Sequence, residues 1–413
     1  MKRSPSLIGL LLLTAVWLLG CQAVDAAQLP TRAAAAVLPV PTGGIPATFT
    51  VGAMTAVATP TSFIPRATAT PSQTPIIPTL TPFTPRPSAT PTPTFSPIIT
   101  PTETPVIKPI GQYAYQEVIP YQAFPVPPGN NGWGMHWIPT VSQDRGVVDR
   151  FVAEMVKMHI KWVVFLNDGA NIGDNDYLVD KLVASGIMPV MRLYRNGVLP
   201  YDGDVGAMVR HYRAKGVYYY QLYNEPNVND ENHQGFANPN QYAIAWATTA
   251  RAIVANGGLP GIGAFSPGGA YEHYDFLDRT LRAIEFNGDA ALLNHAWLSV
   301  HNYHGTRPYD DPDGFLLFRK YDEIVRNHLG RSLPMIGTEG GSYSDDPNVV
   351  KDLLAYQYGY MRDAEPYLLA FSYWLVANQA GGSFDPAWEW QALFRASGYV
   401  HPVVTDYFYR YSR

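Results

Sequence analysis

Two glutamates follow apolar, strand-like runs of the sequence. Glu225 comes directly after YYYQLYN (218–224), and Glu339 closes LPMIGTE (333–339). A carboxylate at the end of a buried strand needs polar partners, because burying a charge without them is costly. Either glutamate could simply be bonded to loop backbone. The two together could also form a carboxyl pair in which one donates a proton and the other attacks an acetal carbon.

The elements that would position these glutamates alternate regularly along residues 111–413. Eight strand-like apolar runs alternate with amphipathic runs whose apolar residues recur every three or four positions. The strand-like runs are 132–138, 161–167, 188–194, 218–224, 261–267, 297–303, 333–339 and 368–375. The helix-like runs are 150–159, 177–186, 207–216, 240–257, 276–286, 315–325 and 349–363.

This alternation predicts βα units around a parallel sheet, and eight units in a domain of this length favour a closed (β/α)8 barrel, an α/β fold. A doubly wound open sheet is the alternative. That fold is usually marked by a glycine-rich phosphate loop, and the nearest segment, Gly261-Ile262-Gly263, lacks the third glycine. In a barrel the carboxyl ends of all strands meet at one mouth, so Glu225 and Glu339 would face each other there.

Further polar and aromatic residues belong to the same strand-like runs. Asn224 precedes Glu225, and the sixth run ends in His301 and Tyr303. Three more candidates for the mouth are His136 in the first run, Arg192 in the third and Trp374 in the eighth. Each also has a structural interpretation: a tryptophan can be core, a histidine a satisfied core or rim residue, and an arginine part of a structural ion pair.

Across residues 131–390 this set of residues resembles the clan A glycoside hydrolases, most closely the family 5 and family 39 branches. The resemblance implies a retaining mechanism on a (β/α)8 barrel. By the clan's Asn-Glu pair at the end of strand four, Glu225 would be the acid/base and Asn224 would bond the sugar 2-hydroxyl. By the clan's glutamate at the end of strand seven, Glu339 would be the nucleophile.

The supporting residues match this clan to different degrees. His301-Asn302-Tyr303 is similar to the clan's His-x-Tyr, whose tyrosine bonds the nucleophile, and Trp374 matches its sugar-stacking tryptophan. Arg192 departs from the pattern, because the clan's arginine normally comes from an earlier strand. Aromatic faces suit the apolar C–H face of a sugar ring, so we expect a carbohydrate substrate, a β-linked poly- or oligosaccharide.

Two other functions fit the same residues. A carbohydrate-binding protein could keep the barrel without turnover, since a fold alone does not fix a function. A transglycosylase would use the same glutamates and differ only in its acceptor. A group of aromatic residues could line sugar subsites: Tyr194, Tyr271, Tyr343, Trp388 and Trp390.

Composition excludes several classes of protein. Lys+Arg number 29 against 34 Asp+Glu, so there is no basic excess and nucleic acid is not an expected partner. The chain has a single cysteine, which excludes a disulfide scaffold and cysteine-based metal sites. No H-E-x-x-H or calcium-loop motif is present, so we expect no metal and no cofactor. We expect the domain to be a monomer.

The first residues have the pattern of a secretory signal. Lys2 and Arg3 precede an apolar run over 7–19, too short to span a bilayer, which ends in LLGC at Cys21. This ending resembles the bacterial lipobox, whose cysteine is lipidated. It predicts a lipoprotein signal peptide over 1–20 and a chain anchored in a membrane at the outer, extracellular side of the cell envelope. An ordinary signal peptide with an incidental cysteine is the alternative.

A Thr/Pro-rich stretch separates this signal from the domain. Proline lacks an N–H and fixes φ, and the stretch has no periodic apolar face, so neither a helix nor a sheet core can form. We therefore predict a disordered linker over 21–110 and a catalytic domain over 111–413.

Overall fold

The structure is a computed structural model that describes residues 107–378 and 386–411. The predicted signal peptide, the lipidation site Cys21 and nearly all of the predicted linker lie outside these residues. Within the described ranges, no helix combines the length and the apolar character needed to cross a membrane.

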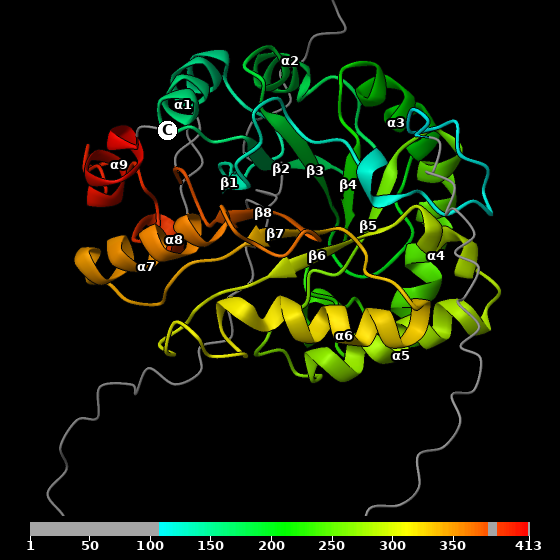
Figure 1. Cartoon of the computed structure of the whole chain (residues 1–413). Coiled ribbons are helices and arrows are strands. Elements are labelled where there is room, and N and C mark those ends of the chain that lie inside the picture. The colour runs from blue at the N-terminus through cyan, green and yellow to red at the C-terminus, as the bar shows by residue number, and fades with distance from the viewer. Residues whose placement is uncertain (1–106, 379–385, 412–413) are drawn as a thin grey trace, which may run out of the picture. The chain divides into compact units, whose positions relative to one another are not determined.

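The described chain forms a closed barrel of eight parallel strands in sequence order, with β1 pairing with β8 (Figure 1). This confirms the predicted (β/α)8 barrel. The strands are β1 (Trp133–His136), β2 (Trp162–Asp168), β3 (Met188–Tyr194), β4 (Tyr219–Leu222), β5 (Leu259–Ile262), β6 (Trp297–His301), β7 (Met335–Glu339) and β8 (Leu368–Tyr373).

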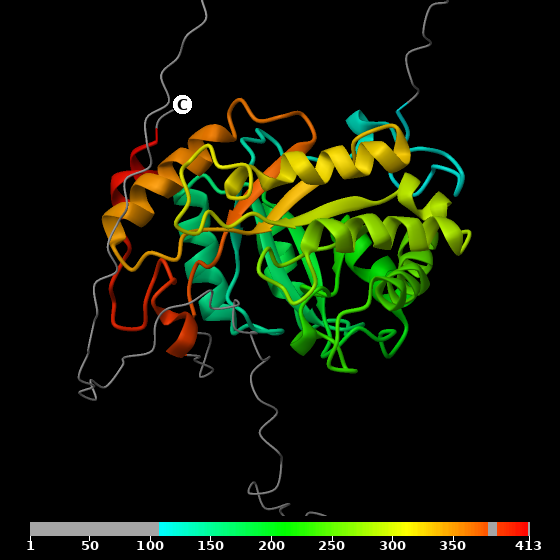
Figure 2. The ribbon, with the colours of Figure 1, turned by 90° about the horizontal axis from the view of Figure 1, so that it is seen from below.

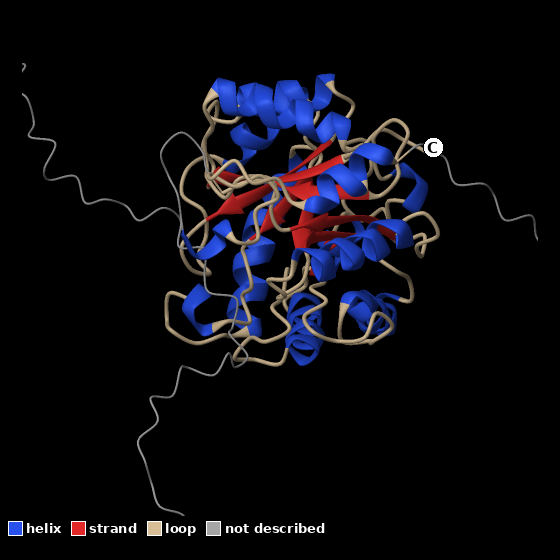
Figure 3. Cartoon of the chain, turned by 90° about the vertical axis from the view of Figure 1, so that its left-hand side faces the viewer, coloured by secondary structure: helices blue, strands red, loops and turns tan. Residues whose placement is uncertain are grey.

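Helices cover the outside of the barrel, as two further views show (Figures 2 and 3). They are α1 (Arg145–Lys157), α2 (Asp176–Ala184), α3 (Val205–Ala214), α4 (Pro239–Ala255), α5 (His273–Phe286), α6 (Phe318–Leu329), α7 (Pro347–Tyr360), α8 (Pro386–Glu389) and α9 (Pro402–Asp406).

Local sequence explains where these helices begin and which face they bury. The Asp144 carboxylate accepts hydrogen bonds from the backbone N–H groups of Gly146 and Val147, which caps the first turn of α1. The side chains that α1 buries recur at helical spacing, at Val148, Phe151, Val152 and Met155.

The fifth strand differs from the prediction. It spans Leu259–Ile262 rather than 261–267, so only two residues overlap. Pro260, which lacks an N–H, concealed the beginning of the strand. Gly263 ends it by adopting a φ of 94°, a conformation that favours glycine.

The amino end of the barrel is filled by large aromatic side chains. Trp162, Tyr219 and Trp297 are fully buried, and the Tyr219 ring contacts the rings of Trp162 and Trp297 at centroid distances of 5.6 and 5.7 Å. The segment before β1 packs against this cluster through Ile110, Tyr113, Ile119 and Phe124. This end is therefore closed by apolar packing, which leaves the carboxyl ends of the strands as the place for polar chemistry.

Candidate active site

Glu225 lies just beyond β4, on backbone with an uncommon conformation. Tyr223 and Glu225 have φ values of 61° and 36°, a region that non-glycine residues rarely adopt. The turn is held by a hydrogen bond from the Tyr223 N–H to the Tyr201 hydroxyl (2.9 Å) and another from the Val228 N–H to the Glu225 carbonyl (2.8 Å). Such backbone persists only where surrounding contacts enforce it, and it is concentrated at functional sites.

Glu339 is the last residue of β7, and an irregular register brings it beside β6. Val300 pairs with Gly337, but the next residue, His301, pairs with Glu339, so Thr338 is skipped. Bulges of this kind redirect side chains next to active sites. The register shift puts the Glu339 carboxylate close to the His301 imidazole.

The two glycines after Glu339 permit a close approach to β8. A Cβ atom at Gly340 would lie 2.3 Å from the Phe371 ring, and one at Gly341 would lie 2.7 Å from the Tyr373 ring. Neither distance is possible for real side chains, so the sequence Glu-Gly-Gly is required for β7 to end here with Glu339 in place.

Two donors hold the Glu339 carboxylate. The Arg192 guanidinium donates to Oε1 at 2.5 Å, and the Tyr303 hydroxyl donates to Oε2 at 2.9 Å. Burial alone raises the pKa of Glu339, but His301, Arg192 and His136 outweigh it and lower that pKa to about 2. Arg192 is the one of the three that carries a permanent charge. Glu339 is therefore an anion throughout the physiological range.

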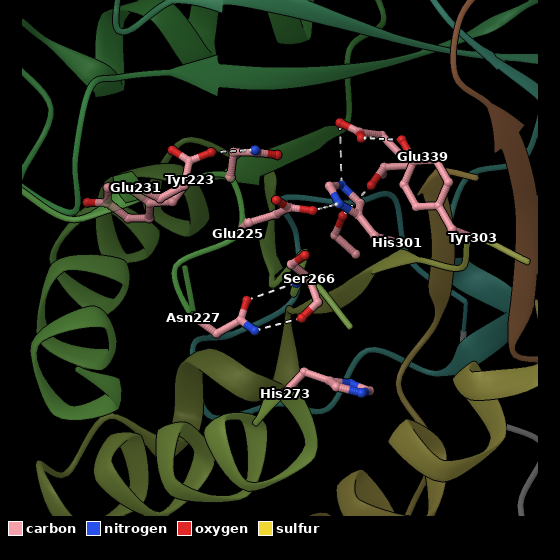
Figure 4. Close-up of polar contacts among 12 residues, drawn as sticks. Tyr223, Glu225, Asn227, Glu231, Ser266, His273, His301, Tyr303 and Glu339 are labelled. Carbon is pink, nitrogen blue, oxygen red and sulfur yellow. Dashed lines mark hydrogen bonds and ion pairs between the residues drawn. The ribbon is translucent and has the colours of Figure 1, made fainter. Parts of the chain in front are cut away.

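His301 lies between the two glutamates (Figure 4). Its Nδ1 lies 2.8 Å from Glu225 Oε1, and its Nε2 lies 3.5 Å from Glu339 Oε1. Nε2 is also 3.3 Å from Arg192 Nη2, which can only donate, so Nε2 accepts and Nδ1 carries the hydrogen. The imidazole thus donates to one oxygen of Glu225 and leaves the other oxygen available for proton transfer.

His136 and Trp374 lie in contact beside this pair. Their ring centroids are 4.2 Å apart, and His136 Nδ1 bonds the Trp137 carbonyl at 2.8 Å. Burial, and after it the Arg192 charge, lowers the pKa of His136 to about 3, so the ring is neutral at pH 7. Its Nε2 is therefore a buried acceptor, and the Trp374 indole N–H is a buried donor. Neither has a protein partner among the described residues.

The structure adds one acidic residue that the sequence did not single out. Glu231, in the loop after β4, is only 9% exposed and accepts a hydrogen bond from the Asn224 side-chain amide at 2.6 Å. Its position in the polar segment VNDENHQ gave no strand-end or periodic signal. Only the folding of the loop onto the site makes it a buried carboxyl group.

The structure thus brings together all eight candidates, which come from six of the strand-like runs: His136, Arg192, Asn224, Glu225, His301, Tyr303, Glu339 and Trp374. The aromatic residues that were expected to line sugar subsites do not all lie in the site. Tyr343 stacks on Tyr303 (5.6 Å), and Trp388 meets Trp374 edge-on (5.6 Å). Tyr271 instead bonds Asp275 of α5 and packs against Phe276.

In residues 107–378 and 386–411, no three His, Cys, Asp or Glu side chains are grouped as metal ligands. The acidic and histidine groups of the site instead bond one another and Arg192. The arrangement is suited to proton transfer and to attack by a carboxylate.

Comparison with known proteins gives matches among solved structures. No protein-family model and no curated protein sequence matches the chain. A GH39 β-xylosidase from Caulobacter crescentus is 17% identical, over 69% of this chain and 71% of that chain, with a TM-score of 0.48. A GH128 (subgroup II) endo-β-1,3-glucanase from Pseudomonas viridiflava is 15% identical, over 68% and 98% of the two chains, with a TM-score of 0.48. At these identities the likeness is one of fold.

Proposed function

We propose that this chain is a retaining glycoside hydrolase with Glu339 as nucleophile and Glu225 as acid/base. The observation that carries the proposal is that the two buried glutamates on either side of His301 have different hydrogen-bond partners. Glu339 has a permanent cation and a tyrosine hydroxyl as partners, whereas the side chain of Glu225 has, among the described residues, only the His301 N–H. One group is thereby suited to attack as an anion, and the other is suited to carry a proton.

The first step forms a covalent intermediate. Glu339 Oε attacks the anomeric carbon while Glu225 donates its proton to the departing glycosidic oxygen, so the carbon–oxygen bond breaks and a glycosyl ester forms. The hydrogen bonds from Arg192 and Tyr303 keep the attacking carboxylate in one orientation. Because each donor occupies a lone pair on a different oxygen, the carboxylate is oriented without being neutralised.

The second step releases the sugar. Glu225, now an anion, takes a proton from water as that water attacks the anomeric carbon, and Glu339 departs as a carboxylate. Two inversions at the same carbon give net retention. The two carboxyl groups should then lie about 5 to 5.5 Å apart, because no water has to fit between nucleophile and sugar.

The substrate class follows from the groups around the pair. Tyr343 stacks on Tyr303, whose hydroxyl bonds Glu339, and Trp374 packs against His136. His136 Nε2 and the Trp374 N–H offer a buried acceptor and donor. A sugar combines apolar C–H faces with a rim of hydroxyl groups. These features support a carbohydrate substrate, and we propose a β-linked poly- or oligosaccharide.

The direct test is hydrolysis by the full chain of a panel of β-linked glucans, xylans, mannans and aryl glycosides. Glu225→Gln and Glu339→Gln are assayed beside it. Turnover that both variants abolish would support the glycosidase and identify the sugar. A folded wild-type chain that binds a glycan but hydrolyses none would instead support a carbohydrate-binding protein.

Replacing Arg192 by Met should move the acidic limb of the pH profile upward. The pKa of Glu339 is depressed to about 2, so the wild-type nucleophile takes up a proton only as the pH falls toward 2. Without the permanent cation, burial raises the pKa of Glu339, and activity falls at higher pH than in the wild type. The measurement is kcat/KM as a function of pH.

Arg195→Met is the matched control. Arg195 lies three residues farther along the chain and pairs with Asp202, an exposed residue, at 3.2 Å. Its replacement should leave the acidic limb unchanged. An acidic limb that stays in place in Arg192→Met would contradict the assigned role of Arg192.

We also propose that Cys21 is lipidated and anchors the chain in a membrane. More than one acyl chain is needed for stable anchoring. Expressed in a bacterium with its own signal, the wild-type chain should incorporate an alkyne-labelled fatty acid and remain in the membrane fraction. Cys21→Ser should do neither. An unlabelled wild-type chain released into the medium would indicate an ordinary signal peptide.

A further inference from the structure

We propose that Glu231 works as an uncharged carboxylic acid that fixes the side-chain amide of Asn224, so that Asn224 meets the substrate with its carbonyl oxygen. Glu231 is then a positioning residue, since it acts on the substrate through Asn224. The inference rests on the hydrolase function proposed above and deepens it, because it specifies what the substrate must present beside the reacting carbon.

The contact between the two side chains is direct and sheltered. Asn224 Nδ2 donates to Glu231 Oε1 at 2.6 Å, and Glu231 is 9% exposed. The loop that carries Glu231 is tied to itself by Asn232, whose amide donates to the carbonyls of Pro226 (2.9 Å) and Val228 (2.7 Å). Glu231 is thus held at a fixed place next to Asn224 rather than carried on a free loop.

The charges around Glu231 favour its neutral form. No Lys, Arg or His of the described ranges forms an ion pair with Glu231, and Arg192, whose charge acts on it, is bonded to Glu339. Glu225 and Glu339 are the other carboxyl groups that act on it. An ionised Glu231 would add a second buried negative charge to a site with one permanent positive charge, which is costly.

The direction in which the pKa of Glu231 is shifted agrees with this balance of charges. Burial raises the pKa of Glu231 well above its ordinary value of 4.5. The hydrogen bond from Asn224 opposes the shift without reversing it. Glu231 can therefore accept from Asn224 through one oxygen while its proton occupies the other.

The hydrogen bond from the Asn224 amide to Glu231 leaves the Asn224 side-chain carbonyl oxygen to be paired by a ligand. Asn224 Oδ1 is buried and has no protein partner among the described residues. A buried acceptor of this kind requires a donor, and unpaired it disfavours binding. The substrate should therefore present a hydroxyl group that donates to Asn224. The resemblance to clan A glycoside hydrolases implies that this group is the hydroxyl at C2.

The test compares substrate pairs across variants of Glu231 in the full chain. The quantity is the ratio of kcat/KM for an aryl glycoside to that for its 2-deoxy counterpart, with the sugar taken from the panel above. Glu231→Gln keeps an uncharged acceptor of the same shape, so activity and ratio should stay within a few-fold of the wild type. Glu231→Leu cannot accept, so the ratio should fall by about tenfold or more.

Asp230→Asn is the matched control, because Asp230 is exposed and adjacent. It should change neither activity nor ratio. A Glu231→Gln variant as inactive as Glu225→Gln would overturn the proposal, because Glu231 would then have to ionise or transfer a proton. An unchanged ratio in a folded Glu231→Leu would overturn it as well.

Failure of the hydrolase function would be recognised separately. If the wild type turns over no glycoside, the charge on Glu231 is still measurable by carboxyl carbon NMR of glutamate-labelled chain, with Glu231→Gln assigning the signal. A carboxylic acid at pH 7 supports the neutral state independently of activity. A carboxylate at pH 7 overturns it.

Discussion

Replacing Glu339 by Gln should abolish turnover, with a loss in kcat on the order of 10⁴- to 10⁶-fold. Glutamine has nearly the same shape but cannot form the glycosyl ester, so every later step is lost. The loss should be in kcat, because the amide still fits beside Arg192 and Tyr303 and the substrate still binds. Steady-state kinetics on the best aryl glycoside measures the effect.

A smaller replacement identifies the role of Glu339. In Glu339→Ala, azide can enter from the face that the carboxylate occupied, so the product should be a glycosyl azide of inverted configuration. Glu323→Gln on α6, an exposed residue, is the matched control and should behave as wild type. Substantial activity in Glu339→Gln without azide would contradict the role of Glu339 as nucleophile.

Replacing Glu225 by Ala should have an effect that depends on the leaving group. For a poor leaving group the loss should be about 10²- to 10⁴-fold, the usual contribution of general acid catalysis. For a dinitrophenyl glycoside, whose leaving group needs no proton, formation of the intermediate should be nearly as fast as in the wild type. The second step then limits turnover, because no base activates water.

The configuration of the product formed with azide distinguishes Glu225→Ala from Glu339→Ala. With Glu225 removed, azide attacks the covalent intermediate on Glu339, so the product should be a glycosyl azide of retained configuration. A loss of equal size for good and poor leaving groups would contradict the acid role. A glycosyl azide of inverted configuration from Glu225→Ala would mean that Glu225 is the nucleophile and Glu339 the acid/base.

Much of the fold and site could be predicted from local sequence. Each strand is an apolar run and α1 to α7 are amphipathic runs, so the order of these elements is visible without knowledge of their contacts. The short helices α8 and α9 were not predicted. The two-residue period of strands then orients side chains. Met188 and Val190 pack inside the barrel, so Arg192 also faces inward, and Ser299 and His301 follow Trp297 in the same way.

The parts that could not be predicted depend on contacts between distant segments. The skipped Thr338, which brings Glu339 beside His301, is a property of the register between β6 and β7 and has no local signature. The contact between Arg192 and Glu339 joins β3 to β7 across the barrel. Glu231 becomes a buried carboxyl group only because its loop folds back on Asn224, and a polar loop sequence does not encode such burial.

The central claim is that Glu339 forms a covalent bond to the sugar. The most direct measurement treats the full chain with an activated 2-deoxy-2-fluoro glycoside of the sugar found by the panel, since the fluorine slows release of the intermediate. The labelled chain is then digested and its peptides analysed by mass spectrometry. We predict one glycosyl group per chain, on Glu339. A label on Glu225 or Glu231, or a catalytically active chain that is never labelled and releases an inverted sugar, would contradict the account.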